Sequence, residues 1–278
     1  MTVLSPRFPH ALPDRRPLAL RLWDDAPEFA GTALFLALCI LPVALAAALD
    51  PRDWLGEAIW LKPLKFLVSL SVYLATLAAF ARWLPAGMAT DRRWRAYAAA
   101  VCLAVLAEVA WIGGAAAMGT GSHFNTSTPL WNLVYGLMGF LAAFLTSASL
   151  AMAVLIHRNP ATGMDPALKL SVVLGLGLTL PLTLVVAFTM AAGTGHLVGV
   201  PLTDARLPVM GWSREVGDLR VPHFIATHAL HAVPLAGWIA ARHLPPRGAT
   251  VAVVLAAGFW VALTFATFAQ ALAGQPFL

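Results

Sequence analysis

Seven apolar stretches, each about 20 residues or longer, limit this chain to very few folds. A helix that crosses a bilayer needs about 20 mainly apolar residues. Hydrophobic residues make up 60% of the chain and charged residues only 11%, whereas soluble domains are about 45–50% apolar. The stretches are too continuous for barrel strands, whose side chains alternate between two faces. The sequence therefore predicts an all-α integral membrane bundle of seven transmembrane helices. The expected spans are residues 29–49, 63–84, 96–118, 129–156, 167–192, 222–243 and 250–272.

The chain divides into a short tail and one membrane domain. Residues 1–27 are rich in Pro and Arg and are expected to form a cytoplasmic N-terminal tail. Residues 28–278 are expected to form a single seven-helix domain with one long loop at 193–221. The first apolar stretch is longer than the about 7–15 residues of a signal-peptide core. We therefore interpret it as a retained first span.

The distribution of Lys and Arg predicts the orientation of the bundle. With the N-terminus in the cytoplasm, twelve basic residues lie in cytoplasmic segments and six in outer segments. An excess of basic residues marks the cytoplasmic side, so the C-terminus is expected outside, as in a bacterial inner-membrane protein. Because these residues lie in short loops between spans, the net charge of +5 does not indicate a nucleic-acid partner. Membrane lipid is the expected surrounding.

A histidine-rich segment near the sixth span is the strongest functional signal. His223, His228 and His231 enter an apolar segment together, and polar side chains inside a bilayer are costly and often functional. In a continuous helix, His228 lies about 8 Å and His231 about 12 Å below His223. With His123 of the 118–128 loop they are candidate metal ligands. The alternative is that each imidazole hydrogen-bonds to a neighbouring helix.

Glu108 is the only acidic residue well inside a span. It lies about 15 Å below the outer end of the third helix, near the expected level of His231. A carboxyl at this depth suits a metal ligand or a general acid or base. Together with His228 and His231 it is a candidate catalytic residue. The alternative is a protonated side chain that only joins two helices.

Basic side chains at the outer ends of the spans are candidate binders of an anionic group. Lys62 and Lys65 lie where the second span begins, and Arg220 lies just before the sixth. They could hold a haem propionate, a phosphate headgroup or a carboxylate, with Asp218 and Asn125 as further cofactor-binding candidates. Lysines at a span end also extend to the interface without any ligand. A salt bridge to Asp218 could equally neutralise Arg220 and order the loop.

The loop between the third and fourth spans also carries a helix-start signal. Thr128 followed by Pro129 is typical of a cap and first turn. The chain contains no P-loop, GxSxG, HExxH or CxxCH motif.

Three motifs resemble those of a group of bacterial multi-pass membrane proteins to which no activity is attached. They are Trp-Leu-Lys-Pro-Leu-Lys-Phe at 60–66, Ser-His-Phe-Asn at 122–125 and Gly-Asp-Leu-Arg-Val-Pro-His-Phe at 217–224. The resemblance covers the second to sixth spans and implies a multi-pass fold but no catalytic residue. The helix count and the histidine-rich late helix also look similar to the seven-helix zinc hydrolases of the ceramidase superfamily. Here, however, the histidines of the sixth span have four and two residues between them, and that superfamily uses three.

These features favour a membrane enzyme with a buried His/Glu site that opens to the extracytoplasmic side. We expect a metal ion (Zn, Fe or Cu) or haem b as cofactor and a lipophilic small molecule such as a quinone as substrate. The chemistry would be redox or metal-assisted. The alternatives are a proton-coupled carrier that uses Glu108 and the histidines as a relay, and a receptor or assembly protein without catalysis. Against the carrier, the sequence shows no internal repeat and no obvious broken helix.

Overall fold

Long apolar helices form nearly all of the structure. The computed structural model describes residues 17–278. In this range six helices are each long and apolar enough to cross a membrane. A bent pair, α7 (Arg220–Thr227) and α8 (Ala229–His243), makes seven spans if it is counted as one. The predicted all-α membrane bundle is therefore confirmed. The six are α2 (Pro27–Leu49), α3 (Leu61–Ala81), α4 (Arg92–Ala117), α5 (Pro129–Arg158), α6 (Pro166–Ala192) and α9 (Pro246–Leu272).

Side-chain caps fix where three of these helices begin. The Asp91 carboxylate accepts the Trp94 N–H at the start of α4. The Asp165 carboxylate does the same for the first turn of α6. Thr128 caps α5, with Pro129 as its first residue, as the sequence predicted. Each cap satisfies a backbone donor that has no partner within its own helix.

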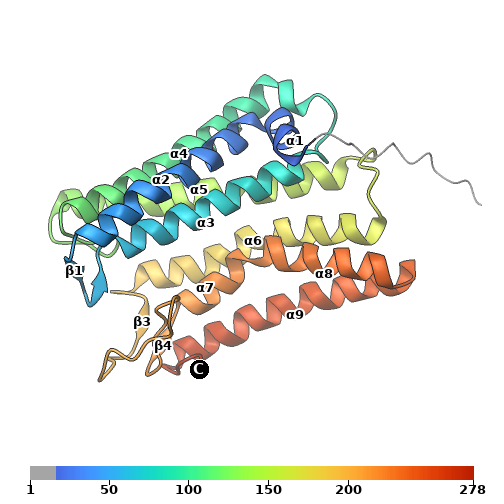
Figure 1. The fold of residues 1–278 in the computed structure, drawn as a ribbon. Helices are drawn as coiled ribbons and strands as arrows, with labels where there is room; N and C mark the ends of the chain where they lie inside the picture. Colours follow the sequence, from blue (N-terminus) through green and yellow to red (C-terminus); the bar gives the residue numbers. More distant parts are fainter. Residues whose placement is uncertain (1–16) are drawn as a thin grey trace, which may run out of the picture.

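The long helices lie side by side in two groups that meet where α5 packs on α6 (Figure 1). Helices α2–α5 form the first group, and the side chains of Leu36, Leu74 and Val105 are fully buried in its core. Helices α6–α9 form the second group. Inside the second group, α6 and α8 approach closely. A Cβ atom on Gly175 would lie 2.6 Å from Pro234 Cδ, so only glycine permits this approach.

Both short hairpins and the C-terminus lie at one end of the bundle (Figure 1). Strand β1 (Asp53–Trp54) pairs antiparallel with β2 (Glu57–Ala58). Strand β3 (Leu197–Val198) pairs antiparallel with β4 (Gly217–Asp218). We call this end, which also includes the 118–128 loop, the hairpin end. The sequence predicts that it is extracytoplasmic.

The opposite end carries the remaining loops, a 3-10 helix (η1, Met88–Thr90) and helix α1 (Leu18–Asp25). Helix α1 lies in the segment that we expected to be a tail; residues 1–16 of that tail lie outside the described residues. Leu18, Leu20 and Trp23 on α1 are more than half exposed, as in a helix that lies at a membrane interface. With eight residues, α1 is too short to span a bilayer, so its sequence does not stand out among the apolar spans.

The sixth span is broken at His228, where α7 and α8 meet at 48°. We expected one continuous helix over 222–243. His228 Nδ1 lies 2.7 Å from the Phe224 carbonyl oxygen, and the backbone N–H of the same histidine uses that oxygen as well. A side chain that enters the helical hydrogen-bond ladder bends a helix. The expectation that no span is broken was therefore wrong.

Candidate functional site

Three segments that are far apart in the sequence meet at the hairpin end. The Arg206 guanidinium of the 193–221 loop lies 2.8 Å from the Glu57 carboxylate on β2. Lys65 Nζ, in the first turn of α3, donates to the Met210 carbonyl oxygen at 3.3 Å. The long loop is therefore fastened to the first hairpin and to α3. It covers the end of the bundle where the candidate residues lie.

Arg220 and Asp218 form the salt bridge that was one of the two expected arrangements. The guanidinium donates to both carboxylate oxygens, with Nη2 2.7 Å from Oδ2 and Nε 3.0 Å from Oδ1. Arg220 also donates to the Gly211 carbonyl oxygen at 2.5 Å. Asp218 is fully buried and accepts the Ser213 N–H. Burial alone would raise the pKa of Asp218, but the hydrogen bonds and charge of Arg220 hold it below its ordinary value. This pair orders the loop.

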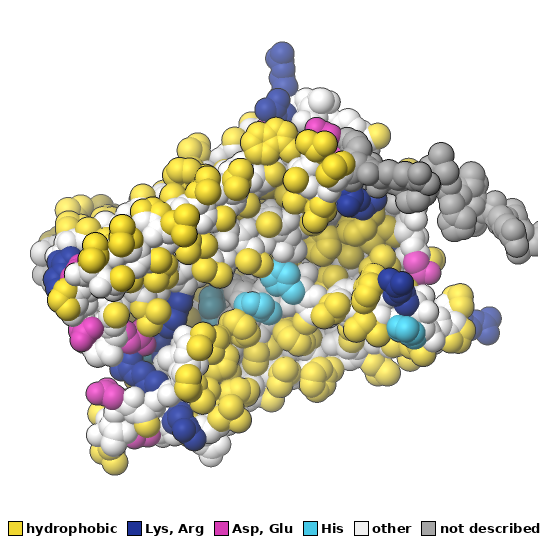
Figure 2. All heavy atoms as spheres, in the orientation of Figure 1, with side chains coloured by type: hydrophobic (Ala, Val, Ile, Leu, Met, Phe, Trp, Pro, Cys, Tyr) yellow, Lys and Arg dark blue, Asp and Glu magenta, His cyan; other side chains and the backbone are white. Residues whose placement is uncertain are grey.

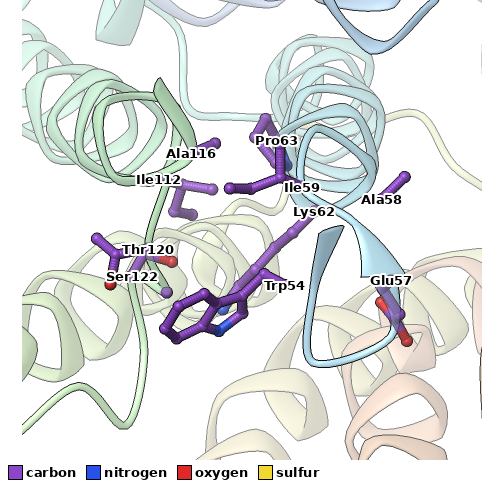
Figure 3. A pocket seen from close by; sticks show the side chains of 11 residues that line it. Trp54, Glu57, Ala58, Ile59, Lys62, Pro63, Ile112, Ala116, Thr120 and Ser122 are labelled. Carbon is purple, nitrogen blue, oxygen red and sulfur yellow. The ribbon is translucent and has the colours of Figure 1, made fainter. Parts of the chain in front are cut away.

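Lys62 differs from these cations because no hydrogen bond or ion pair holds it within residues 17–278. Its side chain extends across a pocket of about 70 Å³, with the ammonium behind the Trp54 indole (Figure 3). Glu57 and Glu108 act on this ammonium electrostatically, though neither lies within 4.0 Å. Of the three basic residues expected to bind an anionic group, Lys65 and Arg220 have partners, and Lys62 has none among the residues that the structure describes.

Glu108 lies on α4 with its side chain buried. Its Oε1 atom has no hydrogen-bond partner in the described part of the chain. Ile112, one helical turn closer to the hairpin end, lines the Lys62 pocket. Side chains four residues apart share a helix face, so Glu108 lies on the side of α4 that faces this pocket. Its charged neighbour is Lys62, and no hydrogen bond joins it to His228 or His231.

His123 and His223 lie near one another at the hairpin end. The His123 ring packs between Phe66 and Tyr135, with centroid separations of 5.8 and 5.9 Å. Burial, together with the nearby Lys62 and His223, lowers the pKa of His123 to about 3, so its imidazole is neutral at pH 7. His223 Nδ1 is buried and has no hydrogen-bond partner among residues 17–278.

His228 and His231 lie farther from the hairpin end than His223, and both are half-buried. The His231 Nε2 atom lies 2.9 Å from the Thr76 hydroxyl of α3, and the His228 ring stacks on Phe224 with centroids 3.8 Å apart. Figure 2 shows histidine side chains in the hollow between the two helix groups. We use the name lateral groove for the partly exposed strip formed by Thr76, Phe224, His228 and His231, which contact one another in turn.

Asn125 organises its own loop. Its amide donates to the Thr120 hydroxyl and the Gly121 carbonyl oxygen, and its side-chain oxygen accepts from Ser127. These bonds use both ends of the side chain. Its cofactor-binding role stays a prediction.

The expected metal and haem sites receive no support from the geometry. In the part of the chain that the structure describes, no three His, Cys, Asp or Glu side chains are placed to hold a metal ion. The Lys62 pocket, at about 70 Å³, is far smaller than the roughly 300–1,000 Å³ of typical ligand sites. A metal set of His123, His223, His228 and His231, and a haem, therefore stay predictions.

Several residues of the site were not found from the sequence. Trp54, Glu57 and Thr120 line the Lys62 pocket, and Thr76 holds His231. Thr76 carried a usable signal, since it is a hydroxyl in an apolar span. Trp54 and Glu57 lie on a short hairpin and Thr120 on a loop, and nothing in a single sequence indicates how such segments fold.

No family model, curated protein or solved structure matches this chain.

Proposed function

We propose that this protein is a membrane enzyme that performs acid–base chemistry on a lipophilic substrate at the hairpin end. The supporting observation is that Glu108 Oε1 and His223 Nδ1 are both buried without a partner within residues 17–278. Most buried polar atoms in proteins have a hydrogen-bond partner, and an exception calls for an explanation such as a ligand or water. Lys62 is the charged neighbour of Glu108, and both Lys62 and His223 act on His123. We therefore take the two unpaired atoms as the place where a polar group binds.

The lateral groove gives a lipophilic substrate a route to these atoms. Phe224, 39% exposed, and the half-buried His228 and His231 present an aromatic and polar strip at the bundle surface. His223 lies on the same broken span, one helical turn or more closer to the hairpin end. An apolar chain can remain in lipid while its polar head reaches His223 and Glu108. In this proposal Glu108 donates a proton to a substrate oxygen or accepts one from it, and His223 orients the substrate.

The test is to identify what the protein retains from its membrane. We expect mass spectrometry of lipid extracts to find a lipophilic compound in the purified protein that is strongly depleted in Glu108→Gln and His223→Ala. His243→Ala, an exposed histidine at the opposite end, should keep it. Equal lipid content in all four proteins would refute the proposed site.

A proton-coupled carrier is the second candidate, and the break at His228 specifically favours it. Broken spans at mid-membrane form the substrate sites of many carriers. To separate the two functions, the retained compound is loaded into proteoliposomes with an internal pH dye. An enzyme converts the compound to a product of different mass. A carrier moves it unchanged, and the internal pH changes as it moves.

Whether the enzyme uses a cofactor is tested by visible absorption spectroscopy and elemental analysis of the purified protein. A Soret band, or zinc, iron or copper in stoichiometric amount, would select haem or a metal. Loss of that signal in His228→Ala but not in His243→Ala would place the cofactor at the candidate site. Equal loss in both variants would place it elsewhere.

A further inference from the structure

The cations of the hairpin end differ in whether they already have a partner. Arg220 is held by Asp218 at 2.7 Å, and Arg206 by Glu57 at 2.8 Å. Lys65 donates to a carbonyl oxygen. Lys62 makes no such contact with any residue from 17 to 278, and unlike the exposed Arg214 it lines a pocket, so we take its charge as the one that a bound ligand would neutralise.

The surroundings of Lys62 make that unpaired charge costly. Ile59, Pro63, Ile112 and Ala116 line the pocket along with the ammonium. Glu57, Thr120 and Ser122 also belong to the lining. The ammonium therefore lies in a partly open pocket, where it loses part of its hydration and is stabilised by a compensating partner. Glu57 is already bound to Arg206 and lies 3.6 Å from Arg220. Glu108 lies one turn deeper and does not touch Lys62.

The pocket offers a second donor and a cover. The Thr120 hydroxyl oxygen accepts from Asn125 Nδ2 at 3.1 Å, which leaves its own proton free to donate. Figure 3 shows Thr120 on the loop side of the pocket and the Trp54 indole across it. The indole packs against the 118–128 loop so closely that a Cβ on Gly121 would lie 2.7 Å from Trp54 Nε1.

We propose that the pocket beneath Trp54 binds an oxyanion, a phosphate or carboxylate group, through the Lys62 ammonium and the Thr120 hydroxyl. The group belongs either to a free ion or to the head of an anionic lipid, because the pocket lies at the hairpin end of the candidate spans. Charge-assisted hydrogen bonds make such an anion a suitable partner for a desolvated lysine. The proposed contacts do not include Glu108 or His223, and the variants tested here leave both residues in place, so the two proposals can fail separately.

The experiment has two arms that share the same variants. In the first, inorganic phosphate is titrated into the purified full chain by calorimetry. In the second, native mass spectrometry counts phosphatidylglycerol retained from nanodiscs that contain phosphatidylglycerol and phosphatidylcholine. Lys62→Gln removes the proposed contact and Lys62→Arg keeps the charge. Arg247→Gln is the matched control, because it removes one charge from an exposed residue at the opposite end.

We expect wild type, Lys62→Arg and Arg247→Gln to bind in at least one arm, and Lys62→Gln to bind at least tenfold more weakly there. Binding in the phosphate arm alone identifies a free ion, and binding in the lipid arm alone a headgroup. The proposal is overturned if wild type binds in neither arm, or if Lys62→Gln binds as wild type does. A thermal melt checks that Lys62→Gln is folded. If it is not folded, Thr120→Val takes its place. We then expect the same tenfold loss of binding in Thr120→Val, and binding as strong as in wild type would overturn the proposal.

Discussion

The two ends of the bundle use basic residues in different ways. At the opposite end, Arg82, Arg158, Arg242 and Arg247 are exposed, and the one ion pair found there within residues 17–278, Arg95 with Glu28, leaves the arginine side chain 54% exposed. At the hairpin end Asp218 is fully buried beneath Arg220. Exposed arginines fit a role in membrane topology. Buried, paired charges instead hold a defined loop structure over the candidate site.

The largest difference should appear when one ion pair is broken at each end. Asp218→Ala leaves Arg220 without its carboxylate and the Ser213 N–H without its acceptor. Loss of one partner of a buried pair costs about 3–5 kcal/mol, whereas an exposed pair contributes about 0–1 kcal/mol. Thermal unfolding in detergent should therefore show a large loss for Asp218→Ala and little change for Glu28→Ala. Similar losses would mean that the ends do not differ in this way.

The contact between β4 and α9 gives the next largest effect. A Cβ on Gly217 would lie 1.9 Å from the Ala271 carbonyl oxygen, so Gly217→Ala must move the backbone. We expect a loss of at least about 1–3 kcal/mol, the usual cost of overpacking. Gly258→Ala in the middle of α9 has open space around its Cβ and should be neutral or stabilising by about 0.5–1 kcal/mol. Unfolding curves that show the same sign for both variants would contradict this packing.

The hairpin end should also be the acid-sensitive one. Burial and the nearby Arg220 lower the pKa of His196 to about 4, and that of His123 is lowered to about 3. Between these values and about 6.5, the unfolded state binds more protons than the folded state. Folding stability is therefore unaffected above pH 6.5 and falls as the pH drops below it, by up to about 1.4 kcal/mol per pH unit for each histidine.

His196→Gln isolates one of these contributions. Melting temperatures measured from pH 7 to pH 5 should fall less steeply in this variant than in wild type. His243→Gln, at the exposed opposite end, should leave the slope unchanged. A wild-type slope in His196→Gln would show that this histidine does not contribute.

The smallest effect tests the hydrogen bond between Thr76 of α3 and His231 of α8 in the lateral groove. Thr76→Val keeps the side-chain shape but removes the hydroxyl that pairs with His231. Hydrogen bonds between membrane helices contribute on average about 0.6 kcal/mol. Thr189 bonds only to a carbonyl oxygen of its own helix, so Thr189→Val is the control and should show a smaller loss. Equal stability of wild type and Thr76→Val would show that this hydrogen bond does not contribute to stability.

Much of the fold could be predicted because it depends on local composition. Six of the seven expected spans correspond to single helices, with ends displaced by at most a few residues. The Thr128 cap and the Asp218–Arg220 pair join residues that are near neighbours in sequence. Their chemistry is therefore visible in the sequence.

The candidate site was harder to predict because it depends on how helices are rotated and how loops fold. One sequence does not say which face of α4 meets α3. Lys62 acts on Glu108 electrostatically, and the expected approach of Glu108 to the deep histidines stays a prediction. The break in the sixth span arises from one side chain–backbone bond at His228. The cover formed by Trp54 depends on a six-residue hairpin, with positive φ at Leu55 and Gly56 in its turn.

The sideways opening of the lateral groove affects how any affinity should be expressed. A ligand that reaches His228 from the bilayer is dissolved in lipid, where partitioning concentrates it well above its level in water. Its occupancy then follows its mole fraction among the lipids. A contact that is weak by aqueous standards can still be saturated in the native membrane, and dilution into detergent micelles can empty it.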